Sequence, residues 1–465
     1  MVDLLNFPQS ISNDIFWQDE SHTYTYQQVK ALAIDHRSLW GEHPKGAICA
    51  LIGFSPLETW VLMLAAWQRG LCVLPFAERT LPAAIELALN QIPWTLRCEK
   101  SPAGDCSQTN SGAISLRVTP NPQGATATES QVLIMTSGST GGPKAIAHTL
   151  SSLSASARAT LAFYEWKKGD SWLLSLDPSH IGGFQILLRV WLGQGLCYYG
   201  GEPKDLAQAL SVRSFSFLSL VPTQIFRLLE DTTTEHNLRA AKAILLGGAA
   251  TQGSLLERLR ALNLPVSITF GASEAASQIS AFSPGVLPTT IKHVGRLLEI
   301  WTLEAGPDEQ LFLSGPALML GYWQHKKWHE LNGSPYLLSD RGRLENGVLT
   351  IEGRADQVFQ VGGENLAPQE ILGLLESFYL LADLALIAKP DLVFGFVPQL
   401  IIRSRTKPSI NDLFARFESL LPMKRPREIW WLETDEVSKL SKANLEHLLR
   451  EGSPLLHRLW IYEKI

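Results

Sequence analysis

The stretch Val132-Leu133-Ile134-Met135, followed by Thr136-Ser137-Gly138-Ser139-Thr140-Gly141-Gly142-Pro143-Lys144, is the most informative part of the chain. The apolar run predicts a buried β-strand, and three glycines and four hydroxyl groups follow it before Pro143-Lys144. Glycines let backbone amides approach an anion closely, hydroxyl groups add hydrogen-bond donors, and the lysine adds positive charge. The segment therefore predicts a binding loop for a polyphosphate. It is not a Walker loop, because Pro-Lys-Ala stands where that pattern requires Gly-Lys-Ser or Gly-Lys-Thr.

On both sides of this loop, short apolar runs alternate with helical stretches. The expected strands cover residues 71–75, 171–176, 216–221, 243–246 and 266–270. Helices are expected to end near Gly70, to cross residues 184–192, and to begin at Pro222, a residue that suits the first helical turn. Apolar strands separated by helices indicate an α/β protein with a mostly parallel, helix-covered sheet. Such sheets bind ligands at the carboxyl ends of their strands, where several Gly, Ser and Glu residues fall here.

Composition limits the classes of function. The chain has 465 residues, enough for two to four domains, and 45% of them are hydrophobic against 18% charged, which excludes a disordered chain. Lys and Arg total 40 against 45 Asp and Glu, so there is no basic footprint for nucleic acid or an anionic membrane. Five cysteines without a CxxC pair argue against a disulfide framework or a zinc site. Because residues 1–6 do not resemble a signal peptide and residues 57–76 carry charges, we expect a cytoplasmic protein without a membrane span.

A second group of candidate residues follows the strand expected over 266–270. Phe270 offers a ring that can stack on a planar base, Gly271 gives close access, and Ser273 adds a hydroxyl group. A carboxylate near a phosphate loop needs a cation between them, so Glu274 is a candidate Mg²⁺ ligand. The alternative is an ordinary helix start, with Ser273 as the cap and Glu274 in the first turn.

Further candidates lie in two later segments and one earlier segment. Asp340, in Ser339-Asp340-Arg341-Gly342, carries a carboxylate that can accept both hydrogen bonds of a vicinal diol, although Asp and Gly are also typical of a turn. Arg354 follows shortly, and after it we expect three or four short strands and three helices. His180 stands before Ile181-Gly182-Gly183, but a lone histidine is more often structural than catalytic, and no HExxH or GxSxG motif accompanies it.

The string at 136–144 resembles the phosphate loop of the adenylate-forming superfamily, which includes acyl-CoA synthetases, non-ribosomal peptide adenylation domains and luciferases. Residues 270–274 resemble the superfamily's aromatic-Gly-x-Thr-Glu motif with Ser in place of Thr, and Gly247-Gly248-Ala249-Ala250 resembles its adenine-side loop. The resemblance extends from about Thr23 to the C-terminal helix. It implies a large N-terminal domain (1–355) with mostly parallel, helix-covered sheets and a small barrel-like part. It also implies a small mobile α+β domain (356–465), with the hinge at Asp356.

The resemblance also implies a role for each candidate. Lys144 and the hydroxyl loop would hold the β- and γ-phosphates of ATP, Glu274 the Mg²⁺ ion, and Asp340 and Arg354 the ribose. The implied ATP-binding residues are Thr136, Ser137, Gly138, Ser139, Thr140, Gly141, Lys144, Gly248, Phe270, Gly271, Ser273, Asp340 and Arg354.

Two C-terminal segments complete the implied site. Ser438-Lys439-Leu440-Ser441-Lys442 resembles the superfamily's lysine signature with Ser in place of Gly. Lys439 would reach the reacting carboxylate and the α-phosphate, and Lys442 is the alternative. Gly362 and Gly363 would line the tunnel for the pantetheine of CoA, or simply form a hairpin before a helix.

Within the superfamily the chain most resembles the ligases for 2-succinylbenzoate, on the stretches around 180–189, 270–277 and 340–351. That acid carries a second carboxylate, which is costly to bury without a cation or several donors. Arg189 is the candidate cation, and a surface helix arginine is the alternative. His180 would gate the acyl pocket, and Ser277 and Thr223 are weaker substrate-binding candidates.

We therefore expect an AMP-forming acid–CoA ligase that uses ATP, Mg²⁺ and CoA on a small-molecule carboxylic acid, in menaquinone or phylloquinone biosynthesis. The oligomeric state is open between monomer and homo-oligomer. Three alternatives remain: a ligase for another aryl or fatty acid, an adenylating enzyme that loads a carrier protein, and a non-catalytic nucleotide-binding protein with the same fold.

Overall fold

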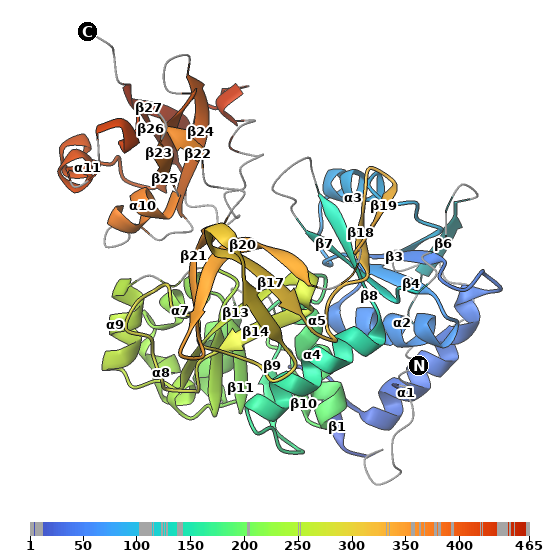
Figure 1. Ribbon diagram of the computed structural model, residues 1–465. Helices are drawn as coiled ribbons and strands as arrows, with labels where there is room; N and C mark the ends of the chain where they lie inside the picture. The colour runs from blue at the N-terminus through green and yellow to red at the C-terminus, as the bar shows by residue number, and fades with distance from the viewer. Residues whose placement is uncertain are drawn as a thin grey trace.

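The computed structural model arranges the chain in four β-sheets with helices packed over the two largest, counted over the described residues (Figure 1). The described residues are 4, 13–101, 114, 116–121, 124, 126, 129–136, 143–201, 205–249, 251, 253–331, 333, 335–354, 359–361, 364–366, 368–375, 379, 383–391, 395–418, 420, 422–434, 445, 448–450 and 452–461. The expected α/β class, with a large sheet-rich N-terminal part and a smaller C-terminal α+β part, is confirmed.

The first sheet is parallel in its middle and antiparallel at its ends. Within the described residues its strands, in spatial order, are β15 (Arg296–Leu297), β14 (Ser277–Ala281), β13 (Val266–Ala272), β12 (Ala243–Leu246), β11 (Phe217–Leu220), β9 (Ser171–Leu173), β10 (Leu196–Tyr198), β1 (Ile15–Gln18) and β2 (Thr23–Thr25). The strand expected over 243–246 has the predicted bounds, whereas the one expected over 171–176 ends at Leu173. The run from β13 to β1 is parallel, which places the ends of these strands at one edge.

The second sheet contains the strands on either side of the loop predicted to bind phosphate. Its strands in the described part of the chain are β19 (Lys327–Glu330), β18 (Gly321–Gln324), β8 (Lys144–His148), β7 (Val132–Thr136), β4 (Cys72–Pro75), β3 (Ile48–Ile52), β5 (Leu96–Lys100) and β6 (Leu116–Pro120). Pairing is parallel from β7 to β5 and antiparallel outside that run. β7 and β8 pair antiparallel, Thr136 opposite Lys144, so the loop connects two strands of a hairpin. Lys144 is therefore the first residue of a strand.

Helices cover and separate these two sheets. Their bounds are α1 (Tyr26–Asp35), α2 (Pro56–Gln68), α3 (Pro82–Leu89), α4 (Leu150–Phe163), α5 (Ile181–Gly193), α6 (Leu206–Val212), α7 (Pro222–Leu228), α8 (Thr232–Arg239) and α9 (Gly253–Ala261). The largest buried cluster joins residues of α2, α4 and α5 to strands of both sheets. Burial of these apolar side chains is the main favourable contribution to folding, at about 25 cal/mol per Å². The α2 and α5 helices were expected, and α5 begins earlier than predicted, at Ile181.

Two smaller sheets follow in the chain. The third is antiparallel and consists, among the described residues, of β16 (Thr302–Ala305), β17 (Gln310–Ser314), β20 (Tyr336–Glu345) and β21 (Val348–Arg354). The fourth comprises β22 (Phe359–Val361), β23 (Glu364–Leu366), β24 (Leu384–Asp391), β25 (Gly395–Ser404), β26 (Glu428–Glu433) and β27 (Leu456–Ile461), with α10 (Pro368–Leu372) and α11 (Ile410–Phe417) beside it. The expectation of three or four short strands there is wrong, because six strands are described and β24 and β25 pair over eight residues each. Figure 1 shows this part as a separate lobe beside β20 and β21.

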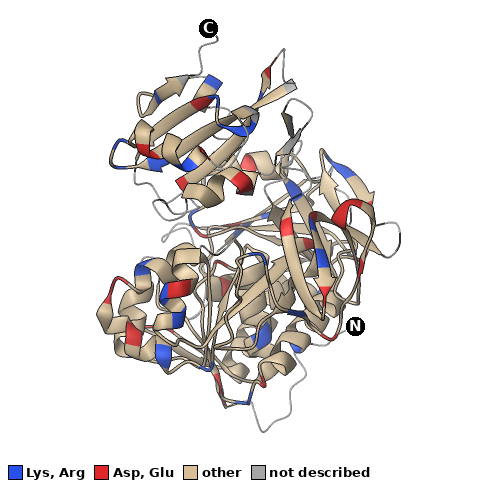
Figure 2. Ribbon diagram, turned by 60° about the vertical axis from the view of Figure 1, so that its left-hand side comes forward, with Lys and Arg blue, Asp and Glu red and all other residues tan. Residues whose placement is uncertain are grey.

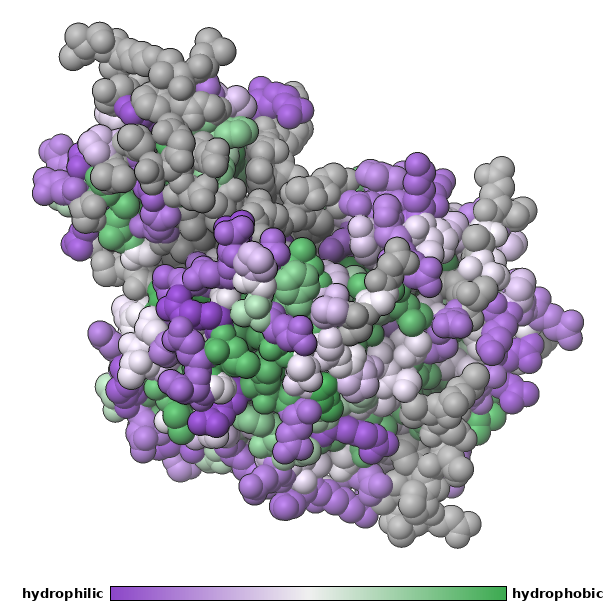
Figure 3. Space-filling view, in the orientation of Figure 1, coloured by the Kyte–Doolittle hydropathy of each residue, from purple (hydrophilic) through white to green (hydrophobic). Residues whose placement is uncertain are grey.

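The surface is mixed in charge and polarity. Figure 2 shows basic and acidic segments interspersed over the ribbon, in agreement with the formal net charge of −5. In Figure 3 hydrophobic residues gather near the middle of the face shown and hydrophilic residues surround them. No helix in the described ranges is long and apolar enough to cross a membrane.

Candidate nucleotide and acid site

An ion pair joins the first residue of β8 to the turn after β13. Nζ of Lys144 lies 2.7 Å from Oε1 of Glu274, and the two side chains are 23% and 15% exposed. The structure thus brings together the side chains predicted for phosphate and for magnesium. No cluster of three or more His, Cys, Asp or Glu side chains suited to a metal ion occurs in the part of the chain that is described. A Mg²⁺ ion beside Glu274 would therefore take its remaining ligands from nucleotide oxygens and water, as this ion commonly does.

The predicted aromatic-to-glutamate segment forms a strand end and a tight turn. β13 continues through Phe270 and Gly271 to Ala272, and residues 273–275 form a 3₁₀ turn before β14. A Cβ atom on Gly271 would lie 1.8 Å from the carbonyl oxygen of Ser277, so only glycine fits at this close approach. The alternative of an ordinary helix start with Ser273 as the cap is wrong, because Ala272 is the N-cap residue of a three-residue 3₁₀ turn and the chain then turns back into a strand.

Two tyrosines line the region around this ion pair. The ring centroid of Tyr322, on β18, lies 5.2 Å from Nζ of Lys144. Burial raises the pKa of Tyr336, on β20, well above its usual value, and the nearby negative charge of Glu274 raises it further. Asp340 and Arg354 also lie within electrostatic reach of Tyr336.

The predicted ribose residues lie on paired strands. Asp340 on β20 stands opposite Arg354 on β21. The alternative that residues 339–342 form a turn is therefore wrong, because pairing with β21 keeps Asp340 inside a ten-residue strand. The shared neighbour Tyr336 connects this pair with the Lys144–Glu274 pair.

Arg189 and Ser277, both predicted to bind the acid, contact each other. Arg189, on α5, is 2% exposed, and its Nη2 donates to Oγ of Ser277 across 3.3 Å. Its guanidinium carbon lies 5.5 Å from the ring centroid of Trp172. Burial lowers the pKa of Arg189 to about 10, so the side chain is still charged at pH 7. The alternative of a surface arginine is therefore wrong.

This buried guanidinium has an unsatisfied donor. Nε of Arg189 has no hydrogen-bond partner, and no carboxylate among the described residues pairs with the side chain. An isolated buried charge is costly unless a partner of opposite sign is present. The arrangement is therefore suited to an anionic group of a ligand.

The remaining described candidates are His180, Thr223 and Gly248. His180 is exposed and is the N-cap residue of α5, but its side chain makes no capping hydrogen bond. Thr223 is half-buried in the first turn of α7. Gly248 has a φ of 78° after β12, in the left-handed region that favours glycine. No polar contact among the described residues joins His180 or Thr223 to Arg189.

Several predicted residues lie outside the described residues. They are Ser137, Gly138, Ser139, Thr140, Gly141, Asp356, Gly362, Gly363 and Lys439, together with the alternative Lys442. Their roles stay predictions. The described strands β22 and β23 pair antiparallel before α10.

Sequence reasoning missed the buried polar residues that support the turn after β13. His148, on β8, contacts the backbone of Ser273, and Gln185, on α5, contacts that of Ala276. Lys144 and His148 are four residues apart in a strand, so their side chains point to the same face of the sheet. The sequence alone could therefore have indicated that His148 lies near Lys144. The position of Gln185 gave no such signal.

The Lys144–Glu274 ion pair and the pairing of Asp340 with Arg354 bring together charged side chains that are suited to an adenine nucleotide. The family model of AMP-binding enzymes matches residues 9–323, and the chain belongs to this family. The 2-succinylbenzoate–CoA ligase of Escherichia coli K12 is 29% identical over 80% of this chain and 82% of that protein. The ligase of the same name from Salmonella typhimurium LT2 is 30% identical over 78% of this chain and 79% of the relative.

Solved structures share the fold. A variant of E. coli MenE with bound OSB-AMS is 24% identical, covers 97% of this chain and 98% of its own, and has a TM-score of 0.76. The o-succinylbenzoate coenzyme A synthetase (MenE) of Bacillus subtilis, in complex with ATP and a magnesium ion, is 20% identical. It covers 90% of this chain and 93% of its own, with a TM-score of 0.73.

Proposed function

We propose that this chain is an AMP-forming ligase that converts 2-succinylbenzoate, ATP and CoA into the CoA thioester, AMP and pyrophosphate. The reaction would serve menaquinone or phylloquinone biosynthesis, in the cytoplasm. Membership of the AMP-binding family and the likeness to 2-succinylbenzoate–CoA ligases over most of the chain support the activity. The single structural observation that supports this choice of acid is Arg189, a buried guanidinium whose Nε has no hydrogen-bond partner.

In the first half-reaction, an oxygen of the succinyl carboxylate forms a bond to the α-phosphorus of ATP. The bond from that phosphorus to the bridging oxygen breaks, and pyrophosphate leaves with the electron pair. Lys144 and the hydroxyl loop would hold the β- and γ-phosphates, while Asp340 and Arg354 would hold the ribose. Glu274 would hold Mg²⁺, which neutralises phosphate charge when bound. Lys439 would stabilise the charge of the transition state as a point charge.

Binding of MgATP would separate the Lys144–Glu274 pair. Each side chain is the other's partner in the ligand-free protein, at 2.7 Å. Phosphate oxygens would replace the carboxylate beside Lys144, and the metal would replace the ammonium group beside Glu274. The Lys144–Glu274 pair would therefore be replaced by a lysine–phosphate pair and a glutamate–metal pair. Neither side chain would be left as an unpaired, partly buried charge.

In the second half-reaction, the CoA thiolate attacks the acyl carbon, the bond to AMP breaks, and AMP leaves with its phosphate. We place the hinge for this step at Asp356, which would rotate residues 356–465 so that Lys439 withdraws and Gly362-Gly363 face the pantetheine. The predicted domains are accordingly 1–355 and 356–465.

The ring carboxylate of 2-succinylbenzoate fits the acid side of the site. The guanidinium of Arg189 is charged at pH 7, buried, and contacts the hydroxyl group of Ser277. An acid with one carboxylate would leave this charge unpaired while its only carboxylate reacts. His180 and Thr223 would bind elsewhere along the acyl group.

A pyrophosphate-release screen over carboxylic acids tests the proposal. With MgATP and no CoA, 2-succinylbenzoate should release pyrophosphate faster than benzoate, fatty acids or amino acids. With CoA added, mass spectrometry should find the 2-succinylbenzoyl thioester. Pyrophosphate release with a different acid only would show that 2-succinylbenzoate is not the substrate. Transfer of the acyl group to a carrier protein but not to CoA would show that CoA is not the acceptor. No pyrophosphate release with any acid would contradict ligase activity.

A further inference from the structure

One tight turn links Glu274, in the proposed nucleotide part of the site, with Ser277, in the proposed acid part. Residues 273–276 connect β13 to β14, so the turn begins beside the Lys144–Glu274 pair and ends next to Ser277, which contacts Arg189. Ala276 and Ser277 have φ values of 49° and 107°, in a region that non-glycine residues seldom adopt. Such a conformation persists only where surrounding contacts hold it.

On the nucleotide side, β8 holds the turn with two side chains. Lys144 pairs with the carboxylate of Glu274, and Nε2 of His148 lies 2.7 Å from the carbonyl oxygen of Ser273. Because a carbonyl oxygen only accepts, the proton of the neutral ring lies on Nε2. The same oxygen accepts the backbone N–H of Ala276, at 3.2 Å, which closes the turn.

On the acid side, two helices hold the turn independently of β8. The carbonyl oxygen of Ala276 accepts from Oγ of Ser156, on α4, at 2.8 Å and from Nε2 of Gln185, on α5, at 3.0 Å. Gln185 also donates to the carbonyl oxygen of Leu153 across 3.1 Å. Both of these polar side chains are buried, as is Arg189, four residues after Gln185 on α5.

His148 is not placed to transfer protons. The side chain is buried, and burial lowers its pKa to about 4, so the imidazole is neutral at pH 7. Its Nδ1 lies 3.4 Å from Oγ of Ser152, and its Nε2–H is engaged by Ser273. Both ring nitrogens therefore contact protein groups.

We propose that His148 is a positioning residue for the magnesium-binding carboxylate. Its Nε2–H fixes the backbone of Ser273, and this contact holds the next residue, Glu274, where metal and phosphate meet. Gln185 and Ser156 fix the other end of the turn, so the two ends respond separately to substitution. The inference rests on the proposed function in one respect, namely that Glu274 is a ligand of Mg²⁺.

Substitution of His148 tests the proposal through the magnesium dependence of catalysis. His148→Phe keeps a planar ring but removes the donor, and His148→Gln keeps an N–H group at a similar reach. We expect the Phe variant to need about 10–100-fold more Mg²⁺ for half-maximal adenylate formation, a range typical of lost outer-shell contacts to metal ligands. The KM for the acid should not change, and the Gln variant should recover most of the Mg²⁺ affinity.

Two further variants separate positioning from stability. His148→Asn is polar but too short to reach Ser273, so it should behave like the Phe variant even if that variant folds poorly. Gln185→Leu, at the other end of the turn, should raise the KM for the acid and leave the Mg²⁺ requirement unchanged. An unchanged Mg²⁺ requirement in both the Phe and Asn variants, or an equal shift in the Gln variant, would overturn the proposal.

Calorimetric titration with ATP distinguishes this inference from the proposed function. The Phe and Asn variants should bind ATP more weakly than the wild type when Mg²⁺ is present, and equally well when it is chelated. This result does not depend on the acid. A wild-type enzyme that adenylates no acid would contradict the ligase activity, whereas equal loss of ATP affinity with and without Mg²⁺ would contradict the role of His148.

Discussion

At the scale of single residues, burial decides the chemistry of Arg189. On the surface, water would solvate this guanidinium. At 2% exposure it instead makes one hydrogen bond, to Ser277, and its Nε has no hydrogen-bond partner. A protein that leaves a buried charge without its partner loses stability, and such a cost is typical of functional sites. Sequence periodicity could place Arg189 on a helix, but it could not distinguish a buried face from an exposed one, because nearly every face of α5 is buried.

Removal of the Arg189 charge should affect the acid alone. We expect Arg189→Met to raise the KM for 2-succinylbenzoate by about 10–100-fold, the equivalent of about 1.5–3 kcal/mol for a charged hydrogen bond. The KM for ATP should stay constant. Because the buried charge is removed, urea unfolding of the ligand-free variant should show no loss of stability.

An analogue of the acid that lacks the ring carboxylate provides the control for Arg189. Wild type should discriminate against this analogue, whereas Arg189→Met should accept both acids about equally. Arg189→Lys, which keeps the charge without the fork of donors, should show intermediate discrimination. Equal discrimination by the wild type and the Met variant would show that Arg189 does not bind the ring carboxylate.

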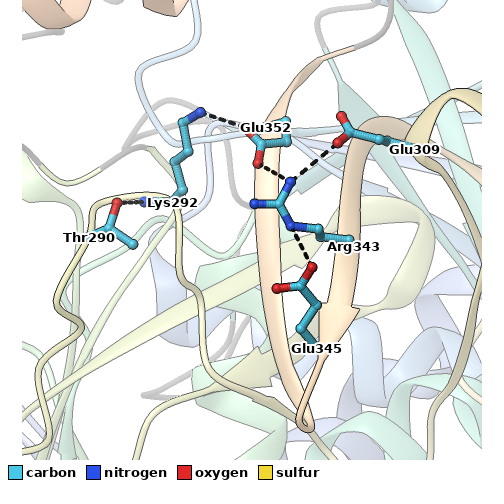
Figure 4. Close-up of polar contacts among 6 residues, drawn as sticks. All are labelled: Thr290, Lys292, Glu309, Arg343, Glu345 and Glu352. Carbon is cyan, nitrogen blue, oxygen red and sulfur yellow. Dashed lines mark hydrogen bonds and ion pairs between the residues drawn. The ribbon is translucent and has the colours of Figure 1, made fainter.

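At the scale of elements, the β20–β21 hairpin combines the pair proposed to bind ribose with an ion-pair network. Figure 4 shows Arg343 among three glutamates, with Lys292 on the far side of Glu352. The distances are 3.0 Å from Arg343 Nη1 to Glu352, 3.3 Å to Glu309 and 3.0 Å from Nε to Glu345. Lys292 Nζ lies 2.5 Å from Glu352. Most of these side chains are substantially exposed, and exposed ion pairs contribute little individually.

We therefore expect Arg343→Ala to destabilise the protein in a salt-dependent way. The variant leaves three carboxylates close together, so at low salt the free energy of unfolding should fall by about 1 kcal/mol. At about 1 M salt the Debye length is roughly 3 Å, so repulsion is screened and the loss should largely disappear. Urea unfolding at both salt concentrations measures the difference.

Lys292→Ala is the matched control in this network. It removes a single contact and leaves Arg343 among the glutamates, so its destabilisation should be smaller than that of Arg343→Ala. The KM for ATP should be unchanged in both variants, since the register of β20 and β21 comes from backbone pairing. A loss that is the same at low and high salt would indicate a packing effect instead.

The elements also show which features were predictable from sequence. The strand and loop at 132–144 and the segment 270–274 are local signals, because glycines, hydroxyl groups and an acid follow directly after apolar runs. Asp340 was ambiguous because Asp and Gly favour turns, and only the partner strand β21 decides that it lies in a strand. The contact of His148 with Ser273 and the proximity of Tyr336 to Glu274 could not be predicted, since these partners are remote in sequence and meet only in the folded chain.

At the scale of the whole molecule, the proposed reaction would use charges from widely separated segments. Lys144, Glu274, Asp340 and Arg354 come from two large sheets and the small antiparallel sheet, and Tyr336 lies within electrostatic reach of three of them. The predicted fifth charge, Lys439, belongs to the C-terminal part. The proposed rotation about Asp356 would let that lysine act in the first half-reaction and leave before the second. The two half-reactions should therefore differ in their need for Lys439.

Separate assays of the half-reactions measure that difference. We expect Lys439→Ala to lose adenylate formation by at least about 10²–10³-fold, a typical cost of removing one group that stabilises transition-state charge. Thioester formation from synthetic acyl-adenylate and CoA should stay near the wild-type rate, because no phosphorus–oxygen bond of ATP breaks in that step. Lys442→Ala should affect neither step strongly. Equal loss of both half-reactions in Lys439→Ala would contradict the separation, and a loss confined to Lys442→Ala would assign the role to that neighbour.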